Sequence, residues 1–281
     1  MEYIDYYKDS QLLYNHNLDY PPFFRNYGMH AHDIYELYYV ISGEGTFTVE
    51  GTTYPLTSRS IYLIRSNEAH YTKLNNTTPY ERICLHFYPG VLDLLDPEHT
   101  LLAPFESHEL GENNFYPLDI TQQTIVTNAF SDISRYSSED SYHKRLSIMI
   151  SLFTILEELN KIFQTEKHQS VDVQKNPRIG AILTYINSHL FEDITADELC
   201  DRFFLSRSQL YDTFKKCTHT TLGAYLLTKR MNAAKTMLKN RVPAKEVAYL
   251  CGYRDYSAFY RAYKKFFHMS PSAHLSPNND G

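Results

Sequence analysis

The first part of the chain alternates apolar and polar residues in the two-residue period of a strand. In residues 34–65, "IYELYYVISGEGTFTVEGTTYPLTSRSIYLIR", β-branched and aromatic residues are interrupted by Gly, Ser and Pro. This pattern predicts short strands, with tight turns at "SGEG" and "VEG". Because no helical segment separates these strands, residues 1–118 are predicted to form an all-β antiparallel barrel or sandwich.

A helical period replaces this alternation in residues 119–164. One apolar stripe contains Leu146, Met149, Ile150, Phe153, Leu156 and Phe163, and a second contains Ile148, Leu152, Ile155, Leu159 and Ile162. An apolar face this wide must be buried on more than one surface. Either the helix packs entirely on its own domain, or the second stripe meets the same helix of another subunit, which would make this a dimerisation segment. Residues 165–177 are polar and aperiodic, and predict a linker.

The C-terminal part contains one pattern twice, at an offset of 48–49 residues. The copies are "ITADELCDRFFLSRSQLYDTFKKCTH" and "VPAKEVAYLCGYRDYSAFYRAYKKFFH". Each begins with a helix-start signal: Thr195 with Glu198 three residues later in the first, and Pro243 in the second. A short helix, a turn and a second helix ending in Lys-Lys follow. Each copy is therefore predicted to be a helix-turn-helix unit.

The segment between the two copies, "LGAYLLTKRMNAAKTMLKN", has a single apolar stripe. It predicts a helix of about 18 residues, which is about 27 Å long. A rigid spacer of that length could place two recognition helices in successive turns of the major groove, which repeat every ~34 Å.

These features resemble the DNA-binding domain of the AraC/XylS family of bacterial transcription regulators over residues 178–275. The matching residues are Ile182, Tyr185, Ile186, Leu199, Leu205, Ser206, Leu210, Phe214, Lys215, Lys216, Tyr225, Arg230, Ala234, Leu238, Val247, Ala248, Gly252, Tyr253, Phe259, Arg261, Lys264, Lys265, Ser270 and Pro271. Three positions depart from the family pattern. His219 and His268 stand where the family usually has Gly, and Asp212 stands where it often has Arg.

The resemblance implies which residues face DNA. The exposed residues of the two recognition helices would be Arg207, Ser208, Tyr211, Asp212, Tyr256, Ser257, Tyr260 and Arg261. Arg261 could donate two hydrogen bonds to a guanine edge, and Asp212 could accept one from cytosine. The lysines at the helix ends would contact phosphates and so position the protein without reading sequence. These lysines are Lys215, Lys216, Lys264 and Lys265.

Charge and cysteine content agree with a DNA-binding protein of the cytoplasm. The chain carries a net charge of −6, but residues 177–281 contain 15 basic and 9 acidic residues, so the charge of residues 1–176 is −12. A basic C-terminal part favours an anionic partner for that part alone. The four cysteines form no CxxC pair, and the sequence shows neither a signal peptide nor an apolar run long enough to span a membrane.

The stretch "MHAHDIYELYYVISGEG", residues 29–45, carries the candidate chemistry of the N-terminal part. Residues 30, 32, 34, 36 and 38 would lie on the same face of a strand. The spacing of His30, His32, Glu36 and Gly43 resembles the first motif of the cupin fold, and His70 stands where the second motif supplies a histidine. Ser60, Arg65 and Asn67 replace residues that the second motif often has as Gly, Pro and Gly.

Regulators that resemble this chain commonly carry a cupin-like sensor whose histidines and glutamate line a ligand cavity. The predicted ligand-binding residues are His30, His32, Glu36, Tyr38, His70 and His86. No cofactor is required, although His30, His32, Glu36 and His70 are types that bind a divalent transition metal such as Zn, Mn, Fe or Ni. The inward tyrosines could stack on a sugar ring.

The sequence as a whole predicts a one-component regulator and not an enzyme. A cupin-like barrel (residues 1–118) would bind a small-molecule effector, with a saccharide as one candidate, and residues 119–164 would form a homodimer. After a linker at residues 165–177, the all-α domain at 178–275 would bind double-stranded DNA and, in an activator, act on RNA polymerase. Two alternatives stay open: a cupin metalloenzyme, either an isomerase or a dioxygenase, fused to a DNA-binding domain, and a regulator controlled by a partner protein or by its abundance.

Overall fold

The computed structural model describes residues 2–22, 28–75, 77–139, 142–165 and 173–274. The strands are β1 (Glu2–Lys8), β2 (Leu12–Asp19), β3 (Tyr35–Ser42), β4 (Gly45–Val49), β5 (Thr52–Leu56), β6 (Ser60–Ile64), β7 (His70–Leu74), β8 (Tyr80–Phe87) and β9 (Phe115–Pro117). The helices are α1 (Ala103–Glu106), α2 (Ile120–Ser138), α3 (Lys144–Gln164), α4 (Pro177–Ser188), α5 (Ala196–Phe203), α6 (Arg207–Thr218), α7 (Leu222–Lys239), α8 (Ala244–Leu250) and α9 (Tyr256–Phe267).

The strands form two antiparallel sheets that face each other. The larger has the order β1-β2-β8-β3-β6-β9, and the smaller has the order β5-β4-β7. Apolar side chains fill the space between them, including Phe47 and Tyr62, which are fully buried. The predicted all-β N-terminal barrel, followed by helices, is confirmed.

The predicted tight turns are present. The β4–β5 hairpin turns at Glu50 and Gly51, which both have positive φ values, 44° and 80°. Two consecutive left-handed residues are typical of the hairpin turn whose twist matches that of the flanking strands. Glu50 is not a glycine, so it holds this conformation at a cost, and its side chain is buried.

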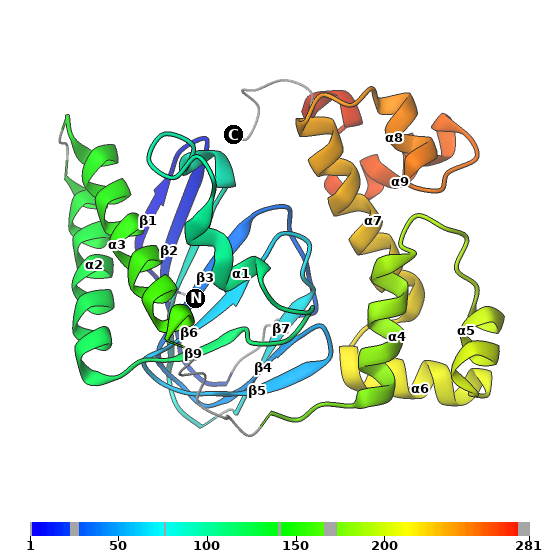
Figure 1. Ribbon diagram of the computed structural model, residues 1–281, viewed down its shortest axis with the longest axis horizontal. Helices are drawn as coiled ribbons and strands as arrows, with labels where there is room; N and C mark the ends of the chain where they lie inside the picture. The colour runs from blue at the N-terminus through cyan, green and yellow to red at the C-terminus, as the bar shows by residue number, and fades with distance from the viewer. Residues whose placement is uncertain (1, 23–27, 76, 140–141, 166–172, 275–281) are drawn as a thin grey trace.

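Helices α2 and α3 cover the outer face of the larger sheet (Figure 1). The second predicted stripe of α3 is buried in the core of this same domain, with Leu152, Ile155 and Leu159 fully buried. The hypothesis that this stripe meets another subunit is therefore wrong, because the sheet and α2 already cover it. The exposed apolar residues of α3 are Leu146 and Ile150, from the first stripe.

The segment before β3 also differs from the prediction. β3 begins at Tyr35, so His30 and His32 do not lie on one strand with Glu36. Instead, His30 exchanges two backbone hydrogen bonds with His70 (3.0 and 2.9 Å), and Asn67 N–H donates to the His32 carbonyl (2.7 Å). These bonds hold residues 30–32 against the start of β7.

The C-terminal helices form two helix-turn-helix units, α5–α6 and α8–α9, joined by α7 (Figure 1). Each unit has its own core, built around Leu199, Leu210 and Phe214 in the first and around Val247 and Phe259 in the second. The repeat and the helix between its copies are as predicted. No helix among the described residues is long and apolar enough to cross a membrane.

Candidate functional site

Helices α6 and α9 begin at well-formed caps. The Ser206 hydroxyl accepts from Gln209 N–H (3.3 Å), and the Gln209 side chain accepts from Ser206 N–H (2.9 Å), which forms a capping box. At α9, the Asp255 carboxylate accepts from Ala258 N–H (2.8 Å). Since caps fix where a helix begins, they also fix which residues occupy its exposed face.

The residues predicted to face DNA lie on these two helices. The exposed ones are Arg207, Ser208, Tyr211, Asp212, Lys215, Lys216, Ser257, Arg261, Lys264 and Lys265. Tyr256 and Tyr260 are half-buried against each other. Two residues of α6 already have partners: Arg207 makes two hydrogen bonds to Asp197 (2.7 and 2.6 Å), and the Ser208 hydroxyl donates to Asp212 (3.3 Å).

His219 and His268 end α6 and α9 in the left-handed conformation, with φ values of 56° and 58°. This is the conformation that a glycine would adopt at the end of a helix. The departures from glycine therefore leave the backbone path unchanged.

Four predicted ligand residues converge in the N-terminal domain. Glu36 on β3 is paired across the sheet with His86 on β8, which places their side chains next to each other. One Glu36 oxygen lies 2.9 Å from His32 Nε2 and 3.1 Å from His70 Nε2, and the other lies 3.4 Å from His86 Nε2. The cluster thus consists of one carboxylate and three imidazoles.

The electrostatics of this cluster centre on Glu36, which is 2% exposed. Burial by itself raises the pKa of Glu36, but the surrounding imidazoles, His86 first, outweigh it and hold the pKa well below its usual range. The carboxylate is therefore ionised at neutral pH.

The other two predicted ligand residues lie apart from the carboxylate. His30 is exposed, packs at a tilt against the His70 ring (centroids 4.2 Å apart) and has its Nδ1 2.9 Å from the Gly28 carbonyl. Tyr38 lies in the packed interior between the sheets, where its hydroxyl contacts the hydroxyl of Tyr80. A saccharide could reach Tyr38 only by displacing core side chains.

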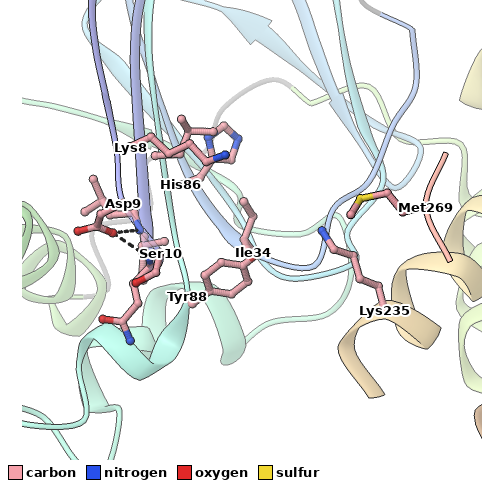
Figure 2. A pocket seen from close by; sticks show the side chains of 12 residues that line it. Lys8, Asp9, Ser10, Ile34, His86, Tyr88, Lys235 and Met269 are labelled. Atoms are coloured by element: carbon pink, nitrogen blue, oxygen red, sulfur yellow. Dashed lines mark hydrogen bonds between the residues drawn. The ribbon is translucent and has the colours of Figure 1, made fainter. Parts of the chain in front are cut away.

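A pocket of about 270 Å³ opens beside the cluster, between the N-terminal domain and α7. Figure 2 shows Lys8, His86 and Tyr88 on one side, Lys235 and Met269 on the other, and Ile34 between them. Because His86 lines this pocket and also contacts Glu36, it connects the pocket to the cluster.

The two domains are joined by buried charges that the sequence did not single out. Lys229 of α7 is 2.6 Å from Glu50 at the tip of the β4–β5 hairpin, and both side chains are almost completely buried. Glu50 also accepts hydrogen bonds from Tyr225 and from Ala69 N–H (2.8 Å). The only sequence signal was a lysine on the apolar side of α7, four residues after Tyr225.

A second group of contacts joins α7 to the segment that carries His32. Asp33 lies 3.0 Å from Lys235 and 3.1 Å from Lys239, and Asn232 donates to the Ala31 carbonyl (2.8 Å). The segment from residue 30 to residue 33 therefore contacts the histidine cluster on one side and α7 on the other.

Comparison with known proteins agrees with this arrangement. A family model described as an AraC-like ligand binding domain matches residues 24–156, and one described as a helix-turn-helix domain matches residues 199–276. The chain belongs to the AraC family of transcriptional regulators. It combines the ligand-binding domain and the DNA-binding domain of that family in one polypeptide.

Similar proteins cover nearly the whole of this AraC-family chain. The Msm operon regulatory protein of Streptococcus mutans is 22% identical over 88% of this chain and 86% of that protein. The HTH-type transcriptional activator RhaR of Mannheimia succiniciproducens is 24% identical over 91% and 88%. Among solved structures, ToxT from Vibrio cholerae aligns with 97% of this chain and 100% of that chain, at 13% identity and a TM-score of 0.38.

Proposed function

We propose that this AraC-family regulator is a homodimeric, cytoplasmic activator that acts on RNA polymerase and responds to a small polar effector of the saccharide class. The observation that carries the proposal is the pair of capped helices, α6 and α9, held apart by the 18-residue α7. Both helices expose polar residues along one face and carry two lysines in the last turn, which suits a helix that reads the major groove.

The residues of α6 and α9 divide into two roles. Ser208, Tyr211, Ser257 and Arg261 would contact base edges, with Arg261 able to read a guanine through two hydrogen bonds. The lysines at the helix ends, Lys215, Lys216, Lys264 and Lys265, would contact phosphates. Arg207, Asp212, Tyr256 and Tyr260 complete the proposed DNA-facing set, and Arg207 would have to leave Asp197 to take part.

The effector would bind in the pocket between the N-terminal domain and α7. Ser10, Gln11 and Lys235 offer polar groups for hydroxyls, and the Tyr88 ring offers a face for a pyranose. At its inner end, His86 leads to His32, Glu36 and His70, with His30 at the edge of the cluster. An effector here would touch both domains, so it could shift the balance between two arrangements of α7.

Activation and dimerisation have separate support. Relatives at 23–24% identity are named as transcriptional activators, which favours activation as the output. The exposed Leu146 and Ile150 lie one helical turn apart on α3, where a second subunit could cover them. A regulator is favoured over a metal-dependent enzyme because the relatives that span most of the chain are regulators.

The test is a gel-shift assay with the DNA upstream of the protein's own gene, at increasing salt concentrations. Binding should weaken steeply with salt, because phosphate contacts release counterions.

A thermal-shift screen against sugars, with and without a chelator, should then find a sugar that raises the melting temperature and changes DNA affinity. Absence of DNA binding at low salt would refute the proposed DNA-reading residues. Turnover of a sugar that is lost in His32→Ala, while DNA binding persists, would favour the enzyme.

A further inference from the structure

The hydrogen bonds of the histidine cluster fix the proton on two of its rings. His32 Nδ1 lies 2.9 Å from the Ile34 carbonyl, and His70 Nδ1 lies 2.9 Å from the Glu68 carbonyl. A carbonyl oxygen can only accept, so both Nδ1 atoms must carry the hydrogen. In a neutral ring, Nε2 then presents a lone pair.

Both of these Nε2 atoms point at an acceptor. They lie 2.9 and 3.1 Å from the same oxygen of Glu36, whose carboxyl group is almost fully buried. That oxygen can carry at most one proton, so at least one of the two lone pairs faces an oxygen that cannot donate to it. An unsatisfied lone pair against an oxygen in a buried site is repulsive, and an extra proton on a ring or a metal cation between these atoms would remove the repulsion.

The donor set fits a metal cation. The ligand atoms of His32, Glu36 and His86 all lie within 4.8 Å of one another. Two imidazoles and one carboxylate are a common ligand set for zinc, and they leave one position open. The carbonyl that holds His32 Nδ1–H is the kind of outer partner that fixes the orientation of a metal-bound histidine.

We propose that His32, Glu36 and His86 hold one divalent transition-metal ion, with zinc as the first choice. His70 is a positioning residue for the Glu36 carboxylate, and His30 is not a ligand. His86 also lines the pocket between the domains, so the proposed site and the pocket share this residue. The site does not depend on the proposed DNA-reading residues or on the effector class.

The test uses the full-length protein, stripped of metal by a chelator and then titrated with Co²⁺ and with Zn²⁺. Wild type should bind one equivalent, with a visible absorption band for Co²⁺ and a rise in melting temperature for Zn²⁺. His32→Gln and His86→Gln should each weaken binding at least tenfold. His99→Gln should bind as wild type does, because His99 is on the surface and pairs with Asp93 (2.8 Å).

Two other results would refute the proposal. Binding of less than one equivalent at micromolar metal would mean that protons supply the positive charge. If His30→Gln loses metal affinity and His86→Gln does not, the ion is bound elsewhere. Its ligands would then be His30, His32, Glu36 and His70. Circular dichroism and DNA binding report whether each variant is folded. If His32→Gln does not fold, the half-buried His86 still decides the outcome.

Discussion

Glu68 is a fully buried carboxyl group two residues before β7. Burial raises the pKa of Glu68 to about 7. The hydrogen bond from Gly111 N–H lowers this pKa, and the charge of Glu50 raises it further. The unfolded chain would release this proton near the ordinary value of 4.5. Between these two values the folded protein holds more protons than the unfolded chain, so the free energy of unfolding falls as pH rises through this window.

We predict that Glu68→Gln flattens the dependence of stability on pH between about 4.5 and 7. The raised pKa corresponds to about 3 kcal/mol of unfolding free energy across the window. The measurement is urea denaturation at pH 5 and at pH 8. For each protein, the quantity compared is the difference in unfolding free energy between the two pH values. Glu109→Gln, which alters an exposed carboxylate, should keep the wild-type change. If Glu68→Gln also keeps the wild-type difference in unfolding free energy, Glu68 is ionised in the folded protein.

Single residues were predictable from the sequence where a motif carried them. His32, Glu36 and His70 were predicted from their spacing, and they do meet. Glu50 and Lys229 were not predicted, because they are 179 residues apart and nothing local marks them as partners. Pairings of this kind depend on how two domains dock, which the period of each segment does not contain.

At the scale of elements, α9 offers a direct comparison of two proposed DNA contacts. We predict that Arg261→Ala weakens binding to the best site by about 1–3 kcal/mol and relaxes the preference at one base pair. Lys264→Ala should instead weaken binding to all sequences alike and reduce the slope of log affinity against log salt by about 0.9. Fluorescence anisotropy with a library of single-base variants separates the two. Equal effects from both variants would show that Arg261 contacts only phosphate.

The exposed residues of α3 give a prediction about assembly. In the proposed homodimer, Ile150→Asp should shift the protein from dimer to monomer in sedimentation velocity, because a carboxylate would replace the exposed Ile150 in the apolar contact. Asn128→Asp, an exposed change on the neighbouring α2, should leave the dimer intact. A dimer that survives Ile150→Asp would place the interface on another surface.

The types of the elements followed from the sequence, but two details did not. The period of α3 showed two apolar stripes without showing which one its own domain would cover, since both satisfy the same helical pattern. The alternation through residues 30–38 suggested one strand, yet the backbone of His30 pairs with His70 instead. Tertiary contacts decided both cases.

At the scale of the whole molecule, the acidic N-terminal part and the basic C-terminal part of the chain are partly neutralised by each other. Lys229, Lys235 and Lys239 of α7 face Glu50 and Asp33 of the N-terminal domain. The excess of basic residues in the C-terminal part predicted an anionic partner, and the structure shows that some of this charge serves domain docking. The lysines on α6 and α9 stay exposed, as the proposed phosphate contacts require.

The Lys229–Glu50 pair should therefore control whether α7 stays docked. In Lys229→Met, Glu50 would keep a buried charge without a cation, a change that typically costs about 3–5 kcal/mol. Undocking costs less than unfolding, because it exposes Glu50 to water while both domain cores stay intact. We expect faster amide hydrogen exchange in α7 and in the β4–β5 turn, and a larger radius of gyration in small-angle scattering.

Two further variants make this expectation specific. Lys235→Met on the same helix should have a smaller effect, because Lys239 remains 3.1 Å from Asp33. Adding Glu50→Gln to Lys229→Met should restore part of the docking, since the uncompensated charge is removed together with its partner. If Lys229→Met alone leaves exchange in α7 and the radius of gyration unchanged, the apolar contacts around Ala69 are sufficient to hold the domains together, and the buried pair does not control their arrangement.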